Sequence, residues 1–398
     1  MSFNDTLAEM ASGKLPSPRV ARFESLISPQ SEASLESLAQ QSRAVTRQHF
    51  GKTMRLFAPI YLSNECVNNC SYCGFSRDNP ILRTTLTVDQ VVAEARHLVG
   101  LGFRHILLVA GEHPKFVSEG YLEECLVALR DLVPTLAIEV GPMEAREYRP
   151  LVAAGCEGLV VYQETYHLEA YAAYHTAGPK KKFAWRVDCP ERGYEAGFRR
   201  IGIGALMGLV DWRYDALRLA AHLDYLYRLG WKATYTISLP RLRPAAGGFQ
   251  PEHEMTDRDL VRALCAFRVC FPQVGVVLST RESESLRNAL FPLGITSISA
   301  GSHTEPGGYT GEGGEDVHLT VKGRRVELED STDPTQPSLP IPGRTCAESG
   351  KKTDATGQFE IADERSPAEV AAHLRSIGLE PVWKDWDPAI LANSLAAV

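Results

Sequence analysis

Short apolar runs rich in β-branched residues alternate with amphipathic stretches through most of the chain. A helix is predicted after Thr87, which can cap it, because the apolar residues that follow recur with helical spacing until Gly100 and Gly102. Residues before about position 55 are also predicted to be helical, since apolar residues recur there near a period of about 3.6 residues. Eight apolar runs predict strands at 57–62, 105–110, 136–140, 158–163, 201–206, 232–238, 274–280 and 295–299.

Strands that alternate with helices predict a parallel sheet, and eight such units predict an α/β fold, a (β/α)8 TIM-type barrel. Its active site would lie at the C-terminal ends of the strands, where polar residues should follow the apolar runs. Residues 311–355 are rich in Gly, Asp, Glu, Thr, Pro and Ser, which favours a mobile segment, and a helix is predicted at 367–377. We therefore expect an N-terminal helical extension at 1–55, the barrel at 56–310, a polar, flexible insertion at 311–356, and a C-terminal helical segment packing on the barrel at 357–398.

Composition narrows the class of protein. The formal net charge of -7 offers no basic stripe for a phosphate backbone, so nucleic acid is not an expected partner. No apolar run approaches the roughly 18 residues of a membrane span, and we expect a cytoplasmic enzyme with no membrane partner. Three of the nine cysteines fall within eight residues and the rest are scattered, a pattern that favours a reducing compartment over a disulfide framework.

The clustered cysteines are Cys66, Cys70 and Cys73, in the segment directly after the first predicted strand. Three thiolates can hold three irons of a cubane iron-sulfur cluster and leave the fourth iron open for chemistry. The alternatives are a structural zinc site or thiols without a metal. Zinc would want a fourth Cys or His nearby, whereas Asn64 and Glu65 precede the triplet and the next histidine is His97. Spacing therefore favours the cluster.

The stretch Cys66-Val-Asn-Asn-Cys70-Ser-Tyr-Cys73 resembles the signature of the radical S-adenosylmethionine (SAM) superfamily. Within that superfamily the chain resembles the 2-iminoacetate synthases, the tyrosine lyases of thiamine thiazole synthesis. The resemblance covers roughly 45–310 and 357–390. Further segments carry it: Gly111-Glu-His113, Val161-Tyr-Gln-Glu-Thr-Tyr-His167, Trp185-Arg186, Pro240-Arg-Leu-Arg-Pro244, Leu278-Ser-Thr-Arg-Glu-Ser283, Glu305-Pro-Gly-Gly-Tyr309 and Pro381-Val-Trp-Lys-Asp-Trp-Asp387.

The resemblance implies a [4Fe-4S] cluster on the three cysteines and SAM on its open iron. It implies two residues, Arg281 and Ser299, that anchor the substrate carboxylate. An arginine suits a carboxylate because its planar fork donates two parallel hydrogen bonds. Each polar residue taken alone has a plainer explanation as a solvated loop residue, and their occurrence at successive strand ends is the stronger argument. The SAM-binding residues that the resemblance implies are Tyr72, Gly111, Glu112, Glu164, Arg186 and Leu206.

The implied reaction starts when one electron enters the cluster and SAM breaks into methionine and a 5'-deoxyadenosyl radical. This radical takes hydrogen from the amino group of L-tyrosine, and the Cα–Cβ bond then breaks to give 2-iminoacetate and p-cresol. The implied partners are reduced flavodoxin or ferredoxin as electron donor and thiazole synthase as recipient of the product. The cofactor carries this chemistry, while the barrel positions the substrate and excludes water.

Three rival functions remain at this stage. The hydrogenase maturase HydG also cleaves tyrosine, but it carries a second cluster on a C-terminal cysteine motif, and Cys346 is alone in that region here. A tryptophan lyase would differ only in pocket residues. The third rival is a non-catalytic iron-sulfur scaffold.

Overall fold

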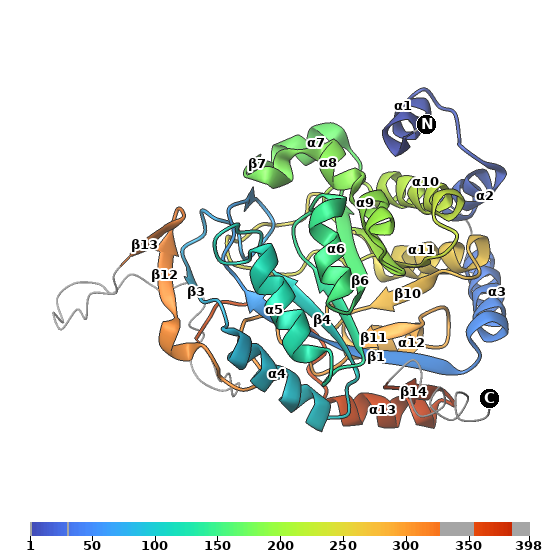
Figure 1. Ribbon diagram of the computed structural model, residues 1–398. Helices are drawn as coiled ribbons and strands as arrows, with labels where there is room; N and C mark the ends of the chain where they lie inside the picture. The colour runs from blue at the N-terminus through green and yellow to red at the C-terminus, as the bar shows by residue number, and fades with distance from the viewer. Residues whose placement is uncertain (1, 30–31, 327–353, 384–398) are drawn as a thin grey trace, which may run out of the picture.

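The computed structural model describes residues 2–29, 32–326 and 354–383. Eight parallel strands form a barrel, which closes where the last of them pairs with the first (Figure 1). Each coincides with a predicted strand to within a few residues, so the predicted fold class is confirmed. In chain order the barrel strands are β1 (Thr53–Ser63), β4 (His105–Ala110), β5 (Thr135–Glu139), β6 (Cys156–Glu164), β8 (Arg200–Ala205), β9 (Thr234–Ser238), β10 (Gly275–Leu278) and β11 (Ser297–Ser299).

Helices surround the barrel because parallel strands must be covered on their outer face. The first of these helices, α4 (Val88–Gly100), begins at the predicted cap, where Thr87 and Gln90 form a reciprocal capping box. Short helical segments α7 (Leu168–Tyr174), η1 (Pro179–Lys181) and α8 (Phe183–Val187) lie in the connection from β6 to β8. The other outer helices are α5 (Glu119–Leu129), α6 (Ala145–Ala153), α9 (Cys189–Ala196), α10 (Trp212–Leu229), α11 (Asp257–Cys270) and α12 (Glu284–Leu290).

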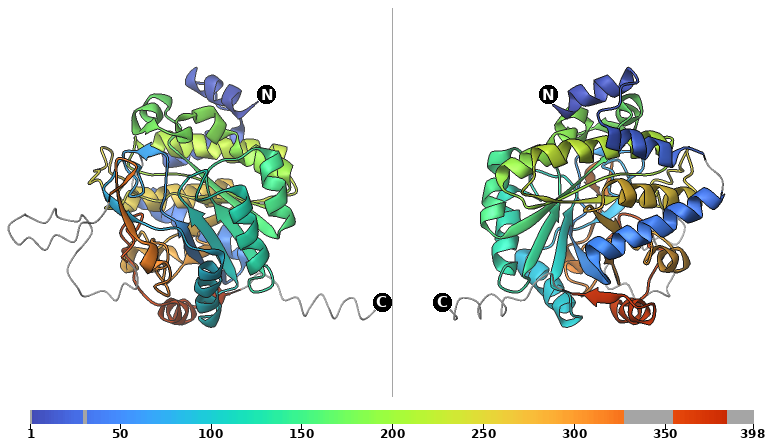
Figure 2. Two further views of the ribbon diagram at one scale, coloured as in Figure 1. Left: turned by 60° about the vertical axis from the view of Figure 1, so that its left-hand side comes forward. Right: turned by 90° about the vertical axis from the view of Figure 1, so that its right-hand side faces the viewer.

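The N-terminal helices pack on one side of the barrel. They are α1 (Phe3–Ala11), α2 (Pro18–Ile27) and α3 (Glu32–Phe50), and the right view of Figure 2 shows them in blue across α10 and α11. Buried aromatic rings join the layers: Phe3 stacks on His222 with ring centroids 4.1 Å apart, and the centroids of Phe23 and Phe267 are 4.5 Å apart. The prefix therefore extends the main hydrophobic core.

Part of the segment expected to be flexible forms regular structure. A turn η2 (Gly314–Asp316) leads into a hairpin of β12 (His318–Val321) and β13 (Arg324–Val326). Strand β12 pairs antiparallel with β3 (Ile81–Arg83) beside the cysteine segment. Composition did not predict this hairpin, because its order comes from backbone hydrogen bonds to a distant strand. Residues 314–326 thus include regular structure that the composition did not predict, and 327–353 lies outside the described residues.

The C-terminal part of the chain crosses the end of the barrel at which the strands have their C-termini. We call this end the mouth. Backbone hydrogen bonds join Thr356 to Leu82, Gln358 to Thr304 and Ala362 to Thr280. We call residues 356–363 the C-terminal strap. The predicted helix follows as α13 (Pro367–Ser376), and β14 (Glu380–Val382) then pairs with the start of β1. Of the predicted stretch 381–387, residues 384–387 lie outside the described part.

The sequence predicts no membrane-spanning segment, and the described helices can be compared with that prediction. None of them is both long enough and apolar enough to cross a lipid bilayer.

Candidate active site

The three clustered cysteines lie between β1 and β3 at the C-terminal end of the barrel. Cys66 and Cys73 are half-buried and Cys70 is buried, and all three are free thiols. Cys70 belongs to the short strand β2 (Asn69–Cys70), which pairs with β7 (His175–Ala177) from the β6–β8 connection. Burial raises the pKa of the Cys66 thiol, and the nearby Cys73 raises it further. The three thiols are therefore close enough to influence one another's ionisation.

A close approach of two backbones holds the cysteine segment on β4. A methyl group added at Gly111 would lie 2.2 Å from the carbonyl oxygen of Glu65 and 3.2 Å from the Cβ atom of Cys66, so only glycine fits there. The Val67 N–H donates to the Glu112 carbonyl oxygen at 2.8 Å. The Asn68 side chain donates to Oε2 of Glu112 at 2.7 Å. Gly111 and Glu112 therefore position the cysteines in this structure.

The donor set fits an iron-sulfur cubane. In the described chain no three His, Cys, Asp or Glu side chains converge closely enough to hold one metal ion. A cubane places no such demand, because each cysteine binds a different iron atom. Lys180 lies near enough to favour the charged form of Cys66 and Cys70. Three reduced thiols and one buried cation suit a cluster of negative charge.

Glu164 stands at the centre of a buried ionic network at the end of β6. Its φ of 70° lies in the left-handed region, which is rare for residues other than glycine and marks strained functional positions. Oε1 of Glu164 is 2.7 Å from Nζ of Lys180 and 3.4 Å from Arg186. Burial alone would raise the pKa of Glu164, but the two cations hold it below its usual value. Arg186 also donates from Nε to the Tyr162 carbonyl oxygen at 2.6 Å.

Lys180 was not among the predicted site residues. Its backbone N–H donates to the Asn68 side chain at 2.9 Å, and its ammonium lies 5.6 Å from the ring centroid of Tyr72. The lysine thus touches the cysteine segment and Glu164 at once. In the sequence it stands first in a run of three lysines, of which the other two are exposed. The Gly-Pro turn that precedes it was the available signal.

Tyr72 and Leu206, both predicted SAM contacts, belong to one apolar cluster with Cys70 and Leu209. The Tyr72 hydroxyl is 2.8 Å from Nε2 of His175, which fixes the ring. The Leu206 N–H donates to the Glu164 carbonyl oxygen at 2.7 Å. The structure therefore brings these two residues together as an apolar wall beside the ionic network.

Arg281 and Ser299, the predicted substrate residues, lie on the far side of the mouth. The guanidinium of Arg281 stacks on the Phe359 ring of the strap, 3.4 Å from its centroid. Burial lowers the pKa of Arg281. The Ser299 hydroxyl accepts a hydrogen bond from the Thr280 N–H at 3.2 Å. Ser299 thus holds the turn that carries Arg281, and a direct contact of Ser299 with substrate stays a prediction.

Two tyrosines and a glutamate, none predicted as site residues, complete the mouth. Tyr61 donates to the Gln358 side chain at 2.9 Å, and the Gln358 amide reaches Sγ of Cys73 at 4.0 Å. Burial raises the pKa of Glu139 to about 7, and the carboxylate of Glu164 adds to this shift. Burial likewise raises the pKa of Tyr162. Glu139 is the last residue of β5, and sequence patterns missed it because the predicted strand 136–140 extended past it.

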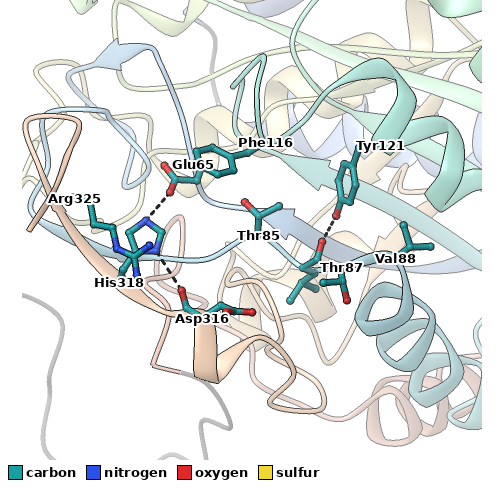
Figure 3. A pocket seen from close by; sticks show the side chains of 10 residues that line it. Glu65, Thr85, Thr87, Val88, Phe116, Tyr121, Asp316, His318 and Arg325 are labelled. Atoms are coloured by element: carbon teal, nitrogen blue, oxygen red, sulfur yellow. Dashed lines mark hydrogen bonds and ion pairs between the residues drawn. The ribbon is translucent and has the colours of Figure 1, made fainter. Parts of the chain in front are cut away.

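A separate cavity of about 410 Å³ lies outside the barrel, between the cysteine segment and the hairpin of β12 and β13. Figure 3 shows His318 between Glu65 and Asp316: Nε2 lies 2.9 Å from Oε1 of Glu65, and Nδ1 lies 3.2 Å from the Asp316 carbonyl oxygen. This contact ties the hairpin to the residue before Cys66. The cavity belongs to the outer face of that segment and not to the mouth.

This fold and this arrangement of cysteines define a radical SAM enzyme. The model of the radical SAM superfamily matches residues 60–220, and the model of the biotin and thiamin synthesis associated domain matches 238–380. The FeFe-hydrogenase maturase HydG from Carboxydothermus hydrogenoformans superposes with a TM-score of 0.78 and 31% identity, over 96% of this chain and 80% of that one.

Two curated relatives narrow the class. The chain is 42% identical to 2-iminoacetate synthase of Escherichia coli (strain K12) over 91% of its length and 86% of the relative's. It is 40% identical to the enzyme of that name from Salmonella typhimurium over the same shares. The chain belongs to the 2-iminoacetate synthase family.

Proposed function

We propose that this chain binds a [4Fe-4S] cluster and SAM and cleaves the Cα–Cβ bond of L-tyrosine, giving 2-iminoacetate and p-cresol for the thiazole of thiamine. The observation that carries the proposal is the 42% identity to the Escherichia coli enzyme across nearly the whole chain. The free cysteines after β1 and the buried ionic network beside them support it. When bound, the cluster and SAM supply the one-electron cleavage that starts the reaction.

The protein's contribution is to hold these groups in a dry, charged mouth. Cys66, Cys70 and Cys73 would bind three irons. Tyr72 and Leu206 would pack against the adenine, and Arg186 would bind the SAM carboxylate. Gly111 keeps the cysteine segment close to β4, and Glu112 would accept from the methionine amino group. Glu164, already paired with two cations, would engage the ribose or methionine part of SAM.

Substrate recognition would fall to the opposite side of the mouth. Arg281 is a half-buried cation that could donate two hydrogen bonds to an amino-acid carboxylate. Ser299 would orient Arg281 by accepting the hydrogen bond from the Thr280 N–H. Alternatively, its hydroxyl would bind the same substrate carboxylate. The strap covers this region through Phe359, which limits the access of water. A cytoplasmic location, reduced flavodoxin or ferredoxin as donor, and thiazole synthase as partner stay predictions.

The test is anaerobic reconstitution with iron and sulfide, followed by incubation with SAM, a low-potential reductant and tyrosine. Equal amounts of p-cresol and deoxyadenosine are expected. Cys70→Ala should abolish both products, whereas Cys125→Ala, at a buried cysteine of α5, should leave them within a few-fold. Skatole from tryptophan, with no p-cresol from tyrosine, would indicate a tryptophan lyase. Absence of deoxyadenosine from well-folded, cluster-loaded protein would favour a scaffold.

A further inference from the structure

Glu139 and Arg281 are two charged residues of the mouth that have no direct partner among the described residues. In the part of the chain that the structure describes, neither side chain takes part in a hydrogen bond or an ion pair; Arg281 only stacks on Phe359. The neighbouring charged groups already have direct partners, because Glu164 pairs with both Lys180 and Arg186. A buried charge is costly unless a partner compensates it. Glu139 and Arg281 therefore lack the partner that the other charges have.

The two residues face each other across the barrel. Strand β5 is the third of the eight and β10 the seventh, so the positions of Glu139 and Arg281 are half a circumference apart. Leu136 and Ile138 of β5 belong to the hydrophobic core that the strands share with the outer helices. Because side chains alternate along a strand, Glu139 points to the opposite face, toward the inside of the barrel. The Arg281 charge influences Glu139, and Glu139 influences Arg281 in turn. The two side chains are therefore close enough to interact electrostatically across the mouth.

A free amino acid carries one charge of each sign on a single carbon atom. An unpaired carboxylate and an unpaired guanidinium on opposite sides of one mouth are complementary to such a zwitterion. We propose that Glu139 binds the amino group of the amino-acid substrate while Arg281 binds its carboxylate. This inference rests on the proposed function and deepens it, because the reacting nitrogen would be held by Glu139.

The surroundings of Glu139 support a cationic ligand. Burial and Glu164 raise its pKa to about 7, so that at neutral pH only about half of the carboxylate is ionised before a ligand binds. An ammonium group would favour the ionised form. The charged and titratable groups that face Glu139 come from five elements or loops: Tyr61 of β1, Tyr162 and Glu164 of β6, Lys180 of η1, Arg186 of α8, and Arg281 after β10.

The competing possibility is that Glu139 accepts from the phenol hydroxyl of tyrosine. Three ligands separate the two: L-tyrosine, L-phenylalanine, which lacks the hydroxyl, and 3-(4-hydroxyphenyl)propionate, which lacks the amino group. All three keep the carboxylate. Their binding to cluster-loaded protein with SAM, without reductant, is measured by equilibrium dialysis, so that no turnover is needed. Failure of tyrosine cleavage in wild type would be seen separately and would concern the proposed function alone.

Glu139→Gln should weaken tyrosine and phenylalanine alike by about 10- to 100-fold, since a hydrogen bond between charged groups is lost, and leave the propionate unchanged. Arg281→Lys should weaken all three. Glu139→Asp, which keeps the charge, should recover part of the tyrosine affinity. Glu157→Gln, at the other end of β6 and paired with Arg200, is the matched control and should change none.

Three outcomes would overturn the inference. The first is a loss limited to the two ligands that carry the hydroxyl, which would assign Glu139 to the phenol. The second is an equal loss for all three ligands, and the third is no loss at all. Thermal unfolding of each variant identifies misfolding, and if Glu139→Gln does not fold, Glu139→Asp with the same three ligands decides.

Discussion

Nζ of Lys180 lies 2.7 Å from Oε1 of Glu164, and both side chains are largely buried. Lys180 also contacts the cysteine segment through Asn68. The ion pair therefore connects the residues that would hold the cluster with those that would hold SAM.

Lys180→Ala should impair SAM binding because Glu164 loses its nearest cation, while the backbone hydrogen bond from residue 180 to Asn68 is kept. We expect the affinity for SAM to fall about tenfold or more, with a moderate loss of stability because Arg186 still compensates Glu164. Binding of SAM to cluster-loaded protein measures this. Lys181→Ala is the matched control, since Lys181 is exposed and should change the affinity little. Equal effects of both substitutions would contradict the role of this ion pair.

Gly111→Ala should displace the cysteine segment, since the new methyl group would meet the carbonyl oxygen of Glu65 at 2.2 Å. Iron and sulfide content after reconstitution should fall severalfold while the secondary structure seen by circular dichroism persists. Gly120→Ala is the control, because no atom lies within 4 Å of its added methyl group and it lies in helix α5. It should stabilise the protein by about 0.4–1 kcal/mol. A full cluster in Gly111→Ala would refute the account of this close approach.

Asp363→Ala should destabilise the protein strongly, because Arg287 is completely buried and would lose its carboxylate partner. Breaking a buried pair costs about 3–5 kcal/mol, so the midpoint of thermal unfolding of this 398-residue chain should fall by roughly 4–6 °C. Glu369→Ala, which removes the exposed N3 residue of the capping box of α13, should lower the midpoint far less. Similar shifts for the two variants would argue against the buried pair as an anchor of the strap.

The same pair gives the stability a pH dependence of known sign. Burial would raise the pKa of Asp363, but the hydrogen bond from Arg365 and the charge of Arg287 lower it. The contribution of Asp363 is therefore present at neutral pH and is lost as the pH falls through the lowered pKa. Asp363→Ala should flatten the acid side of the stability profile.

Tyrosine binding should weaken as the pH falls from 8 to 6. The raised pKa of Glu139, about 7, means that acid protonates it within this range, and a neutral carboxyl attracts an ammonium group less. Binding by wild type should therefore follow one titration near this value, whereas Glu139→Gln should bind weakly and show no such dependence. A pH profile shared by both proteins would show that another group is responsible.

Local patterns predicted much of the fold. The apolar runs located all eight barrel strands, and Thr87 marked the start of α4. The same patterns failed at the hairpin of β12 and β13, whose order depends on β3, more than 230 residues earlier. Polar residues at strand ends pointed to Glu164 and Arg281. Glu139, the last residue of β5, was missed because the predicted strand extended past it to residue 140.

The order of strands and helices and the spacing of Cys66, Cys70 and Cys73 were determined by the sequence alone, because they depend on residues close together in the chain. Only the tertiary structure decided which charges are paired and which are open. In the sequence Lys180 cannot be told from the two lysines after it, and only the fold places it beside Glu164. Likewise, the fold stacks Arg281 on Phe359, which lies 78 positions later in the chain. Such relationships arise when the barrel closes, since closure brings distant strand ends into one mouth with little water.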